Sequence, residues 1–185
     1  MALTLNDISS LLNTQGSKQY GGEAVSQLEH ALQCAYLAEC AQETEETITA
    51  ALLHDIGHML ISESGEPIIE NDENTDDLHQ YVALPFIRNL FSDAVLGPIK
   101  LHVDAKRYLC AVDKAYWETL SEASKKSLEL QGGIYTDEQA LAFETSPFGQ
   151  QAVRLRRYDD LAKIPGAETP SIEHYIAIMQ RVANQ

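Results

Sequence analysis

Apolar residues recur along most of this 185-residue chain at the three- and four-residue spacing of an amphipathic helix. Val25, Leu28, Ala31, Leu32 and Ala35 form one such series. The alternation of apolar and polar residues that is typical of a strand is essentially absent, and no repeat or Pro/Gly/Ser-rich linker divides the chain. The pattern predicts an all-α fold, with residues 1–185 forming one bundle-like domain.

Capping residues, glycines and prolines set the expected bounds of the helices. Thr136 and Gln139 fit a capping box, Ser146 and Pro147 fit a helix start, and Pro85 is expected to kink or break a helix. Helices are expected over 5–14, 24–41, 44–57, 78–84, 92–101, 103–120 and 122–130, from 136 onward, from 146 through 154–160, and over 171–182. The acidic stretch 63–77 is expected to be a solvated loop or a mobile lid.

Composition and charge exclude several classes of function. The net charge of −15 argues against a nucleic-acid partner, because phosphate backbones require a basic surface. No apolar run reaches the roughly 18 residues of a membrane span, and the first residues lack the basic and apolar regions of an export signal. Cys34, Cys40 and Cys110 have neither a paired nor a zinc-finger spacing, so they are expected to be reduced thiols in a cytoplasmic protein.

Histidines and aspartates on separate predicted helices are the candidate metal ligands. His54 and Asp55 are adjacent near the end of an apolar helical run. Imidazole and carboxylate groups are favoured by transition metals, and a carboxylate can bridge two metal ions because it has two oxygens. For each residue alone, a hydrogen-bonded core histidine or an ordinary ion pair is the alternative. Together they predict a two-metal site built from His30, His54, Asp55, His79, His102 and Asp159.

With a net charge of −15, any anionic ligand would need cationic side chains close to the candidate ligands, and the chain offers some. Lys106 follows His102 by four residues and His58 follows His54 by four, so each pair is expected on one helical face. The Arg156 guanidinium presents a planar fork of N–H donors that can bind two oxygens of an anionic group at once. The alternative for any single cation is a solvated surface charge.

Four motifs resemble a known family. The spaced histidines and aspartates are similar to those of the HD-domain superfamily, whose members are largely metal-dependent phosphohydrolases. Within it, the chain resembles the mixed-valent diiron oxygenases of phosphonate catabolism, of the PhnZ-type 2-amino-1-hydroxyethylphosphonate dioxygenase kind. The resemblance spans about residues 5–163, and its motifs are Tyr20-Gly21-Gly22-Glu23, Gln27-Leu28-Glu29-His30, His54-Asp55-Ile56-Gly57-His58 and Leu155-Arg156-Arg157-Tyr158-Asp159-Asp160.

This resemblance implies a role for each candidate residue. One iron would be bound by His30, His54, Asp55 and Asp159, with Asp160 as the alternative to Asp159. The other iron would be bound by His79 and His102, with Asp55 bridging an Fe(II)/Fe(III) pair. The phosphonate would be held by His58, Lys106, Ser124, Ser127 and Arg156, and Tyr20 and Glu23 would close the site until substrate binds. Glu23 would also suit a substrate ammonium group; its alternative is a charge that favours a helix N-terminus.

The resemblance therefore implies an enzyme that uses O2 to cleave the C–P bond of a 1-hydroxyphosphonate. Its expected substrate is 2-amino-1-hydroxyethylphosphonate, and its products are glycine and phosphate. Three alternatives stay open: the same oxygenase acting on a trimethylammonio-substituted hydroxyphosphonate, a metal-dependent phosphohydrolase of the same frame, and a non-catalytic helical module in which metals only stabilise or sense. The oligomeric state cannot be read from the pattern.

Overall fold

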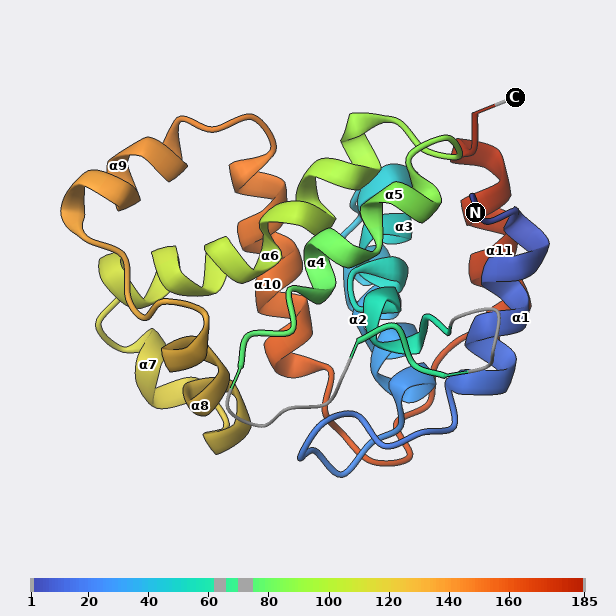
Figure 1. The fold of residues 1–185 in the computed structure, drawn as a ribbon, viewed down its shortest axis with the longest axis horizontal. Coiled ribbons are helices and arrows are strands. Elements are labelled where there is room, and N and C mark those ends of the chain that lie inside the picture. Colours follow the sequence, from blue (N-terminus) through green and yellow to red (C-terminus); the bar gives the residue numbers. More distant parts are fainter. Residues whose placement is uncertain (1, 62–65, 70–74, 185) are drawn as a thin grey trace.

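The computed structural model describes residues 2–61, 66–69 and 75–184, and this part of the chain is helical (Figure 1). It contains two isolated β-bridges and no strand, which confirms the expected all-α fold. The helices are α1 (Leu5–Gln15), α2 (Gln27–Cys40), α3 (Glu45–Leu53), the 3-10 helix η1 (Ile56–Met59), α4 (His79–Val82), α5 (Leu84–Ile87), α6 (Asp93–Val112), α7 (Tyr116–Thr119), α8 (Glu122–Leu130), α9 (Asp137–Glu144), α10 (Gly149–Leu161) and α11 (Ile172–Val182).

Helix α3 lies at the centre of the main core. It packs against α2, α6, α10 and α11, and every residue from Thr47 to Leu53 is buried. A helix that is apolar on all sides is stable only when neighbours surround it. The adjacent Ala50 and Ala51, both fully buried, allow those neighbours to approach closely.

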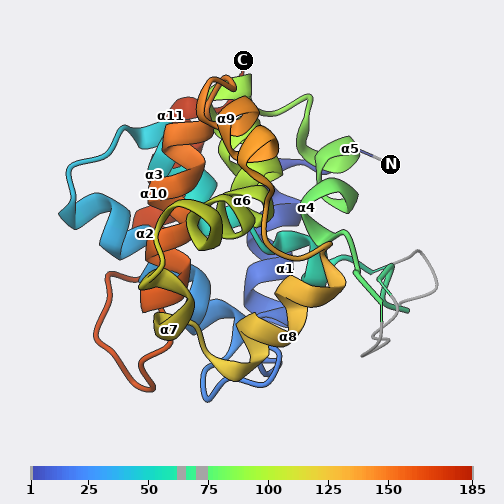
Figure 2. The same cartoon turned by 90° about the vertical axis from the view of Figure 1, so that its left-hand side faces the viewer.

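Helices α6 and α10 pack against each other and separate two parts of the molecule (Figure 1). On one side lies the main core, with α1, α2, α3 and α11. On the other side lie α7, α8 and α9, over two smaller apolar clusters that include Leu128 and Phe143. The view in Figure 2 shows α7 and α8 together below α9. Residues on α6 and α10 can therefore contact both parts.

Local signals explain most helix starts. Capping boxes at Thr4, Ser26 and Thr136 satisfy the free N–H groups at the starts of α1, α2 and α9. The box at Thr136 was expected from the sequence. Pro85 lies at the start of α5, directly after α4 ends, which confirms the expected break. Residues 63–65 and 70–74 of the acidic stretch 63–77 lie outside the described residues, and 66–69 and 75–77 form no helix.

Several expected helix bounds are wrong. Residues 92–101 and 103–120 were expected as two helices, but α6 is continuous because Val95, Ile99 and Val103 give it one buried apolar face. It ends at Val112, where Asp113 adopts an extended conformation. Helix α10 begins at Gly149 rather than at Ser146, whose hydroxyl donates to the Phe143 carbonyl at 2.7 Å and closes the end of α9.

The helix expected over 44–57 ends at Leu53, so His54 and His58 do not share a helical face. The chain turns at Asp55 (φ −105°, ψ 11°) and continues as η1. Gly57 permits this turn to pack against α4: a Cβ added at Gly57 would lie 2.4 Å from the His79 carbonyl oxygen. The close approach brings the segment after α3 beside the start of α4.

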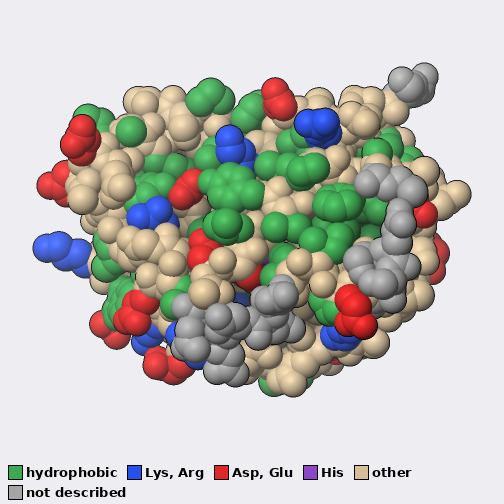
Figure 3. Space-filling view, viewed as in Figure 1, with side chains coloured by type: hydrophobic (Ala, Val, Ile, Leu, Met, Phe, Trp, Pro, Cys, Tyr) green, Lys and Arg blue, Asp and Glu red, His purple; other side chains and the backbone are tan. Residues whose placement is uncertain are grey.

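No helix in the described ranges combines the length and the apolar character that crossing a membrane requires. Apolar side chains do reach the surface. Figure 3 shows several of them gathered near the middle of the face that Figure 1 presents. Leu78 and Tyr81, at α4, are among the exposed apolar residues.

Candidate metal centre

Five segments direct imidazole and carboxylate groups to one point between α3, α6 and α10. The chain supplies them from α2, the end of α3, the start of α4, the middle of α6 and the last turn of α10. All six are at least 94% buried: His30, His54, Asp55, His79, His102 and Asp159. The structure thus brings together the complete set of expected ligands from positions scattered over most of the chain.

One oxygen of Asp55 faces the first group of side chains. Asp55 Oδ2 lies 3.4 Å from His54 Nε2 and 3.7 Å from His30 Nε2. The two Nε2 atoms lie 3.3 Å apart. Asp159 completes the group, with Oδ1 3.6 Å from His30 Nε2 and Oδ2 3.8 Å from His54 Nε2. A single metal ion could contact all four side chains.

The other oxygen of Asp55 faces the second group. Asp55 Oδ1 lies 3.2 Å from His79 Nε2 and 3.5 Å from His102 Nε2, and these two nitrogens lie 3.0 Å apart. Oδ1 is buried and accepts no hydrogen bond of good geometry. Asp55 therefore lies between two clusters, in the position that a bridging carboxylate takes in a dinuclear centre.

Hydrogen bonds at the far side of each ring fix which nitrogen faces the centre. The Nδ1 atoms of three rings donate to main-chain carbonyls: His30 to Ala162 at 2.9 Å, His54 to Ala51 at 2.9 Å and His102 to Ile99 at 2.7 Å. His79 Nδ1 donates to Asp77 Oδ1 at 2.7 Å. Because each Nδ1 carries the hydrogen, each Nε2 of a neutral ring has its lone pair free to bind a metal.

These side chains fit a pair of metal ions. Two unprotonated nitrogens 3.0–3.3 Å apart cannot hydrogen-bond to each other, so each pair calls for a cation between them. Although burial opposes it, Asp55 and Asp77 raise the pKa of His79 to about 10, so the position favours positive charge. Burial likewise opposes ionisation of Asp55, but the surrounding imidazoles, His54 first, hold its pKa well below the usual range.

The carboxylates of the neighbouring Asp159 and Asp160 face different partners. Asp159 faces the histidines, as described above. Asp160 instead accepts hydrogen bonds from Arg156 Nη2 and the Tyr116 hydroxyl. Arg156 also lies 2.7 Å from Asp159, through its Nη1, and donates through Nε to the Tyr116 hydroxyl at 3.2 Å. The guanidinium thus anchors both carboxylates, and Asp159, rather than Asp160, directs its carboxylate at the histidines.

A buried cation lies on the α8 side of the centre. Lys106 is only 2% exposed and donates through Nζ to Ser127 Oγ at 2.7 Å. Burial, followed by repulsion from Arg156, lowers the pKa of Lys106 to about 7. Ser124 lies one turn earlier on α8 and accepts a hydrogen bond from Lys163 Nζ at 3.1 Å. Three of the expected phosphonate-binding residues therefore lie together between α6 and α8: Lys106 contacts Ser127, and the Ser127 hydroxyl donates to the Ser124 carbonyl at 3.1 Å.

Tyr20 covers the first group of side chains around Asp55. Its ring stacks on His30, with ring centroids 3.8 Å apart, and its hydroxyl donates to Asp159 Oδ1 at 3.5 Å. Burial, then the charge of Asp159, raises the pKa of Tyr20 well above 10, so the phenol stays protonated. The main chain holds this loop closed through Tyr20 N–H to Val25 O at 2.9 Å.

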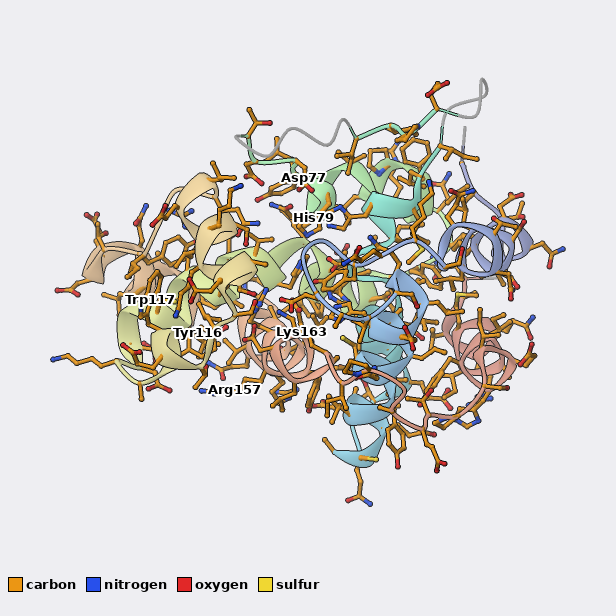
Figure 4. The ribbon with its side chains drawn as sticks, turned by 90° about the horizontal axis from the view of Figure 1, so that it is seen from below. Asp77, His79, Tyr116, Trp117, Arg157 and Lys163 are labelled. Carbon is orange, nitrogen blue, oxygen red and sulfur yellow. The ribbon has the colours of Figure 1, made fainter. Side chains whose placement is uncertain are left out.

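Glu23 contacts Ser121, directly before α8, and Lys163, after the end of α10. Although burial opposes it, a hydrogen bond from Ser121 Oγ at 2.6 Å and the ammonium of Lys163 at 3.1 Å lower the pKa of the carboxyl group. Lys163 was not a sequence candidate, because it follows the end of α10 and its partner is distant in the chain. Figure 4 shows Lys163 near the middle of the view.

His58 lies beside the second group of ligands rather than over the first. Its ring stacks on that of His79, with centroids 4.3 Å apart, and its Nδ1 lies 3.2 Å from Asp77 Oδ2. Burial, then His79, lowers the pKa of His58 to about 4. Asp77 was also missed by sequence reasoning; Figure 4 shows it next to His79.

Cys34 is a third residue that sequence reasoning did not assign to the site. Its Sγ lies 3.6 Å from His30 Nε2, and the side chain is fully buried. Burial, then the charge of Asp159, raises its pKa well above the usual value, so it is a thiol. Its position four residues after His30 on α2 is the signal that could have identified it.

Comparison of the sequence with known proteins identifies its family. Residues 28–131 match the HD domain. A hydroxymethylphosphonate dioxygenase of Gimesia maris is 44% identical, over 94% of this chain and 92% of its own. The [1-hydroxy-2-(trimethylamino)ethyl]phosphonate dioxygenase (glycine-betaine-forming) of Leisingera caerulea is 37% identical, over 96% and 89%. An uncharacterized protein of Acanthamoeba polyphaga mimivirus is 34% identical, over 95% and 80%. The chain belongs to the HD-domain family, alongside relatives that are hydroxyphosphonate dioxygenases.

Proposed function

We propose that this protein is a diiron dioxygenase that cleaves the C–P bond of a 1-hydroxyphosphonate. One observation carries the proposal: the two oxygens of Asp55 face two separate pairs of imidazole nitrogens, and every ring has its Nδ1 hydrogen committed elsewhere. The dioxygenases among the relatives support an oxidative reaction over hydrolysis. The overall conversion balances as hydroxyphosphonate plus O2 giving a carboxylic acid and phosphate.

The proposed iron ligands follow the two groups around Asp55. The first iron is held by His30, His54, Asp55 and Asp159, and the second by His79, His102 and Asp55. When bound as an Fe(II)/Fe(III) pair, the irons supply the oxygen chemistry that oxidises C1 of the substrate. The protein supplies the position of the substrate and the neutralisation of its charge.

The residues on the α8 side suit the phosphonate group, whose charge is near −2. Lys106 and Arg156 provide charge-assisted donors, and Ser124 and Ser127 provide hydroxyls within one helical turn of each other on α8. The lowered pKa of Lys106 suits this role, since a phosphonate dianion beside it favours the protonated amine. His58 is the remaining candidate, on the side of the second iron.

We propose that Tyr20 and Glu23 close the site until substrate binds. Tyr20 covers His30 and Asp159, so a substrate that reaches the first iron must displace it. Glu23 would contact the part of the substrate beyond C1. For 2-amino-1-hydroxyethylphosphonate, the substrate expected from the sequence, that part is an ammonium group, and the ammonium would have to share the carboxylate with Lys163.

The relatives extend the set of substrates to be tested. Their names specify hydroxymethylphosphonate, which lacks an amine, and the trimethylamino compound that yields glycine betaine. For this chain, 2-amino-1-hydroxyethylphosphonate would yield glycine and phosphate, and hydroxymethylphosphonate would yield formate and phosphate. All three share the hydroxyl and phosphonate groups on one carbon.

The test is release of inorganic phosphate by iron-loaded protein from each of the three compounds, in air and under strict anaerobiosis. We expect one phosphate per O2 consumed from at least one compound, and none without O2. Equal release under anaerobiosis, or full turnover with zinc or magnesium in place of iron, would overturn the proposal in favour of the phosphohydrolase. Asp55→Ala protein is the control for phosphate released by contaminating enzymes.

A further inference from the structure

The four inward histidines are not oriented in the same way. His30, His54 and His102 direct Nδ1 at main-chain carbonyls, which no substitution can remove. His79 directs Nδ1 at a side chain, the carboxylate of Asp77, at 2.7 Å. The orientation of one ring in the second group therefore depends on one residue that is not itself among the ligands.

Asp77 contacts His79 at two points and His58 at a third. Its Oδ1 accepts from Nδ1 of His79 and from the main-chain N–H of His79 at 3.2 Å. Its Oδ2 lies 3.2 Å from His58 Nδ1. The His58 and His79 rings stack on each other, so Asp77 holds both through one carboxylate.

The local backbone explains how an aspartate two residues before His79 reaches the ring. Leu78, between them, adopts a left-handed conformation (φ 52°, ψ 28°) directly before α4. This conformation is uncommon for a residue other than glycine, and such residues gather at functional sites. It folds the chain back so that the Asp77 carboxylate faces both the first N–H of α4 and the side chain at its start.

The two groups around Asp55 differ in the number of carboxylates that they contain. The first group has two carboxylates, Asp159 and a share of Asp55, but the second group has only its share of Asp55. A carboxylate hydrogen-bonded to the outer nitrogen of a ligand histidine raises the basicity of the inner nitrogen and fixes its tautomer. Asp77 supplies the second group with the negative charge that its own ligands lack.

We propose that Asp77 is a positioning residue that sets the metal affinity of the His79/His102 half of the centre. This inference rests on the proposed function, because it requires that the two groups bind metal. Loss of such an outer partner lowers metal affinity by about 10- to 100-fold. The loss should fall on one of two metal ions, since the first group has no contact with Asp77.

The experiment is an anaerobic titration of metal-free protein with Fe(II) against a competing chelator. The wild-type protein should bind two ions. Asp77→Ala should bind the first as the wild type does and the second about 10- to 100-fold more weakly. Asp77→Asn, which keeps an acceptor oxygen, should recover part of the loss. Asp76→Asn removes the same charge from the same segment and should bind as the wild type does, because the Asp76 side chain accepts from the main chain of Leu78.

A double-mutant comparison separates positioning from a merely structural role in the turn. If Asp77 acts through the second site, adding Asp77→Ala to His102→Ala should cause no further loss of metal affinity. Equal weakening of both ions in Asp77→Ala, or additive losses in the double variant, would overturn the inference. A wild-type protein that binds fewer than two ions would instead overturn the dinuclear proposal itself, and this inference with it.

Discussion

Replacing Lys106 with methionine is expected to make the metal-free protein more stable while weakening its binding of phosphonates. The Lys106 side chain is 2% exposed, and its pKa falls from the ordinary 10.5 to about 7 because burial disfavours the charged amine. The unfolded chain binds a proton at this site below pH 10.5, whereas the folded chain does so only below about 7. Lys106 therefore costs stability below pH 10.5, and the cost disappears as pH rises through that value.

The size of this cost follows from the two pKa values. At about 1.36 kcal/mol for each pH unit between them, Lys106 costs about 4 kcal/mol at pH 7 and about 1 kcal/mol at pH 10. Methionine has a similar shape and no charge. It loses the hydrogen bond to Ser127, which contributes about 1 kcal/mol at every pH. The variant's advantage should thus shrink by about 3 kcal/mol between pH 7 and pH 10.

The assay is urea unfolding of both proteins, without metal, at several pH values from 7 to 10. The difference in the free energy of unfolding cancels the titration of other groups that the two proteins share. A difference that stays constant across this range would refute the reasoning. In the iron-loaded enzyme, the same substitution should raise KM for the phosphonate at least tenfold, which is the trade-off expected of a binding residue.

The other predictions concern the ligands and their supports. Gly57→Ala should lose about 1–3 kcal/mol of stability in urea unfolding and also lower iron content, because the new Cβ would displace the main chain of His79; normal iron content would contradict this. Asp159→Asn should lower the iron bound by elemental analysis, whereas Asp160→Asn should keep both ions; the reverse result would exchange their roles. Arg156→Met should cost about 3 kcal/mol or more in urea unfolding at pH 7, since it leaves the buried carboxylate of Asp159 and the partly buried carboxylate of Asp160 without their cation; an unchanged midpoint would contradict it.

The sequence predicted which imidazole and carboxylate groups converge at the centre better than it predicted their surroundings. The histidines stood out because they lie on separate predicted helices, and His54 and Asp55 because they are adjacent near the end of an apolar helical run. The four-residue rule placed Lys106 beside His102 correctly because α6 is continuous there. The same rule placed His58 wrongly, because the helix ends at Leu53 and the turn after it depends on packing against α4.

Two of the residues that sequence reasoning missed, Asp77 and Lys163, act through contacts that no local pattern encodes. Asp77 reaches His79 through a left-handed residue that is not glycine, so the sequence gives no sign of the turn. Lys163 meets Glu23 only after α2, α8 and α10 have packed together. Pairings of this kind arise from tertiary structure, and they determine how the centre is shaped and charged.

The most direct test of a paired iron centre is the electron paramagnetic resonance spectrum of the purified, iron-loaded and partly reduced protein. The geometry around Asp55 predicts the signal of a coupled Fe(II)/Fe(III) pair with half-integer total spin, and the signal should shift when a hydroxyphosphonate is added. A spectrum of isolated ferric ions alone, unchanged by the hydroxyphosphonate, would contradict the account.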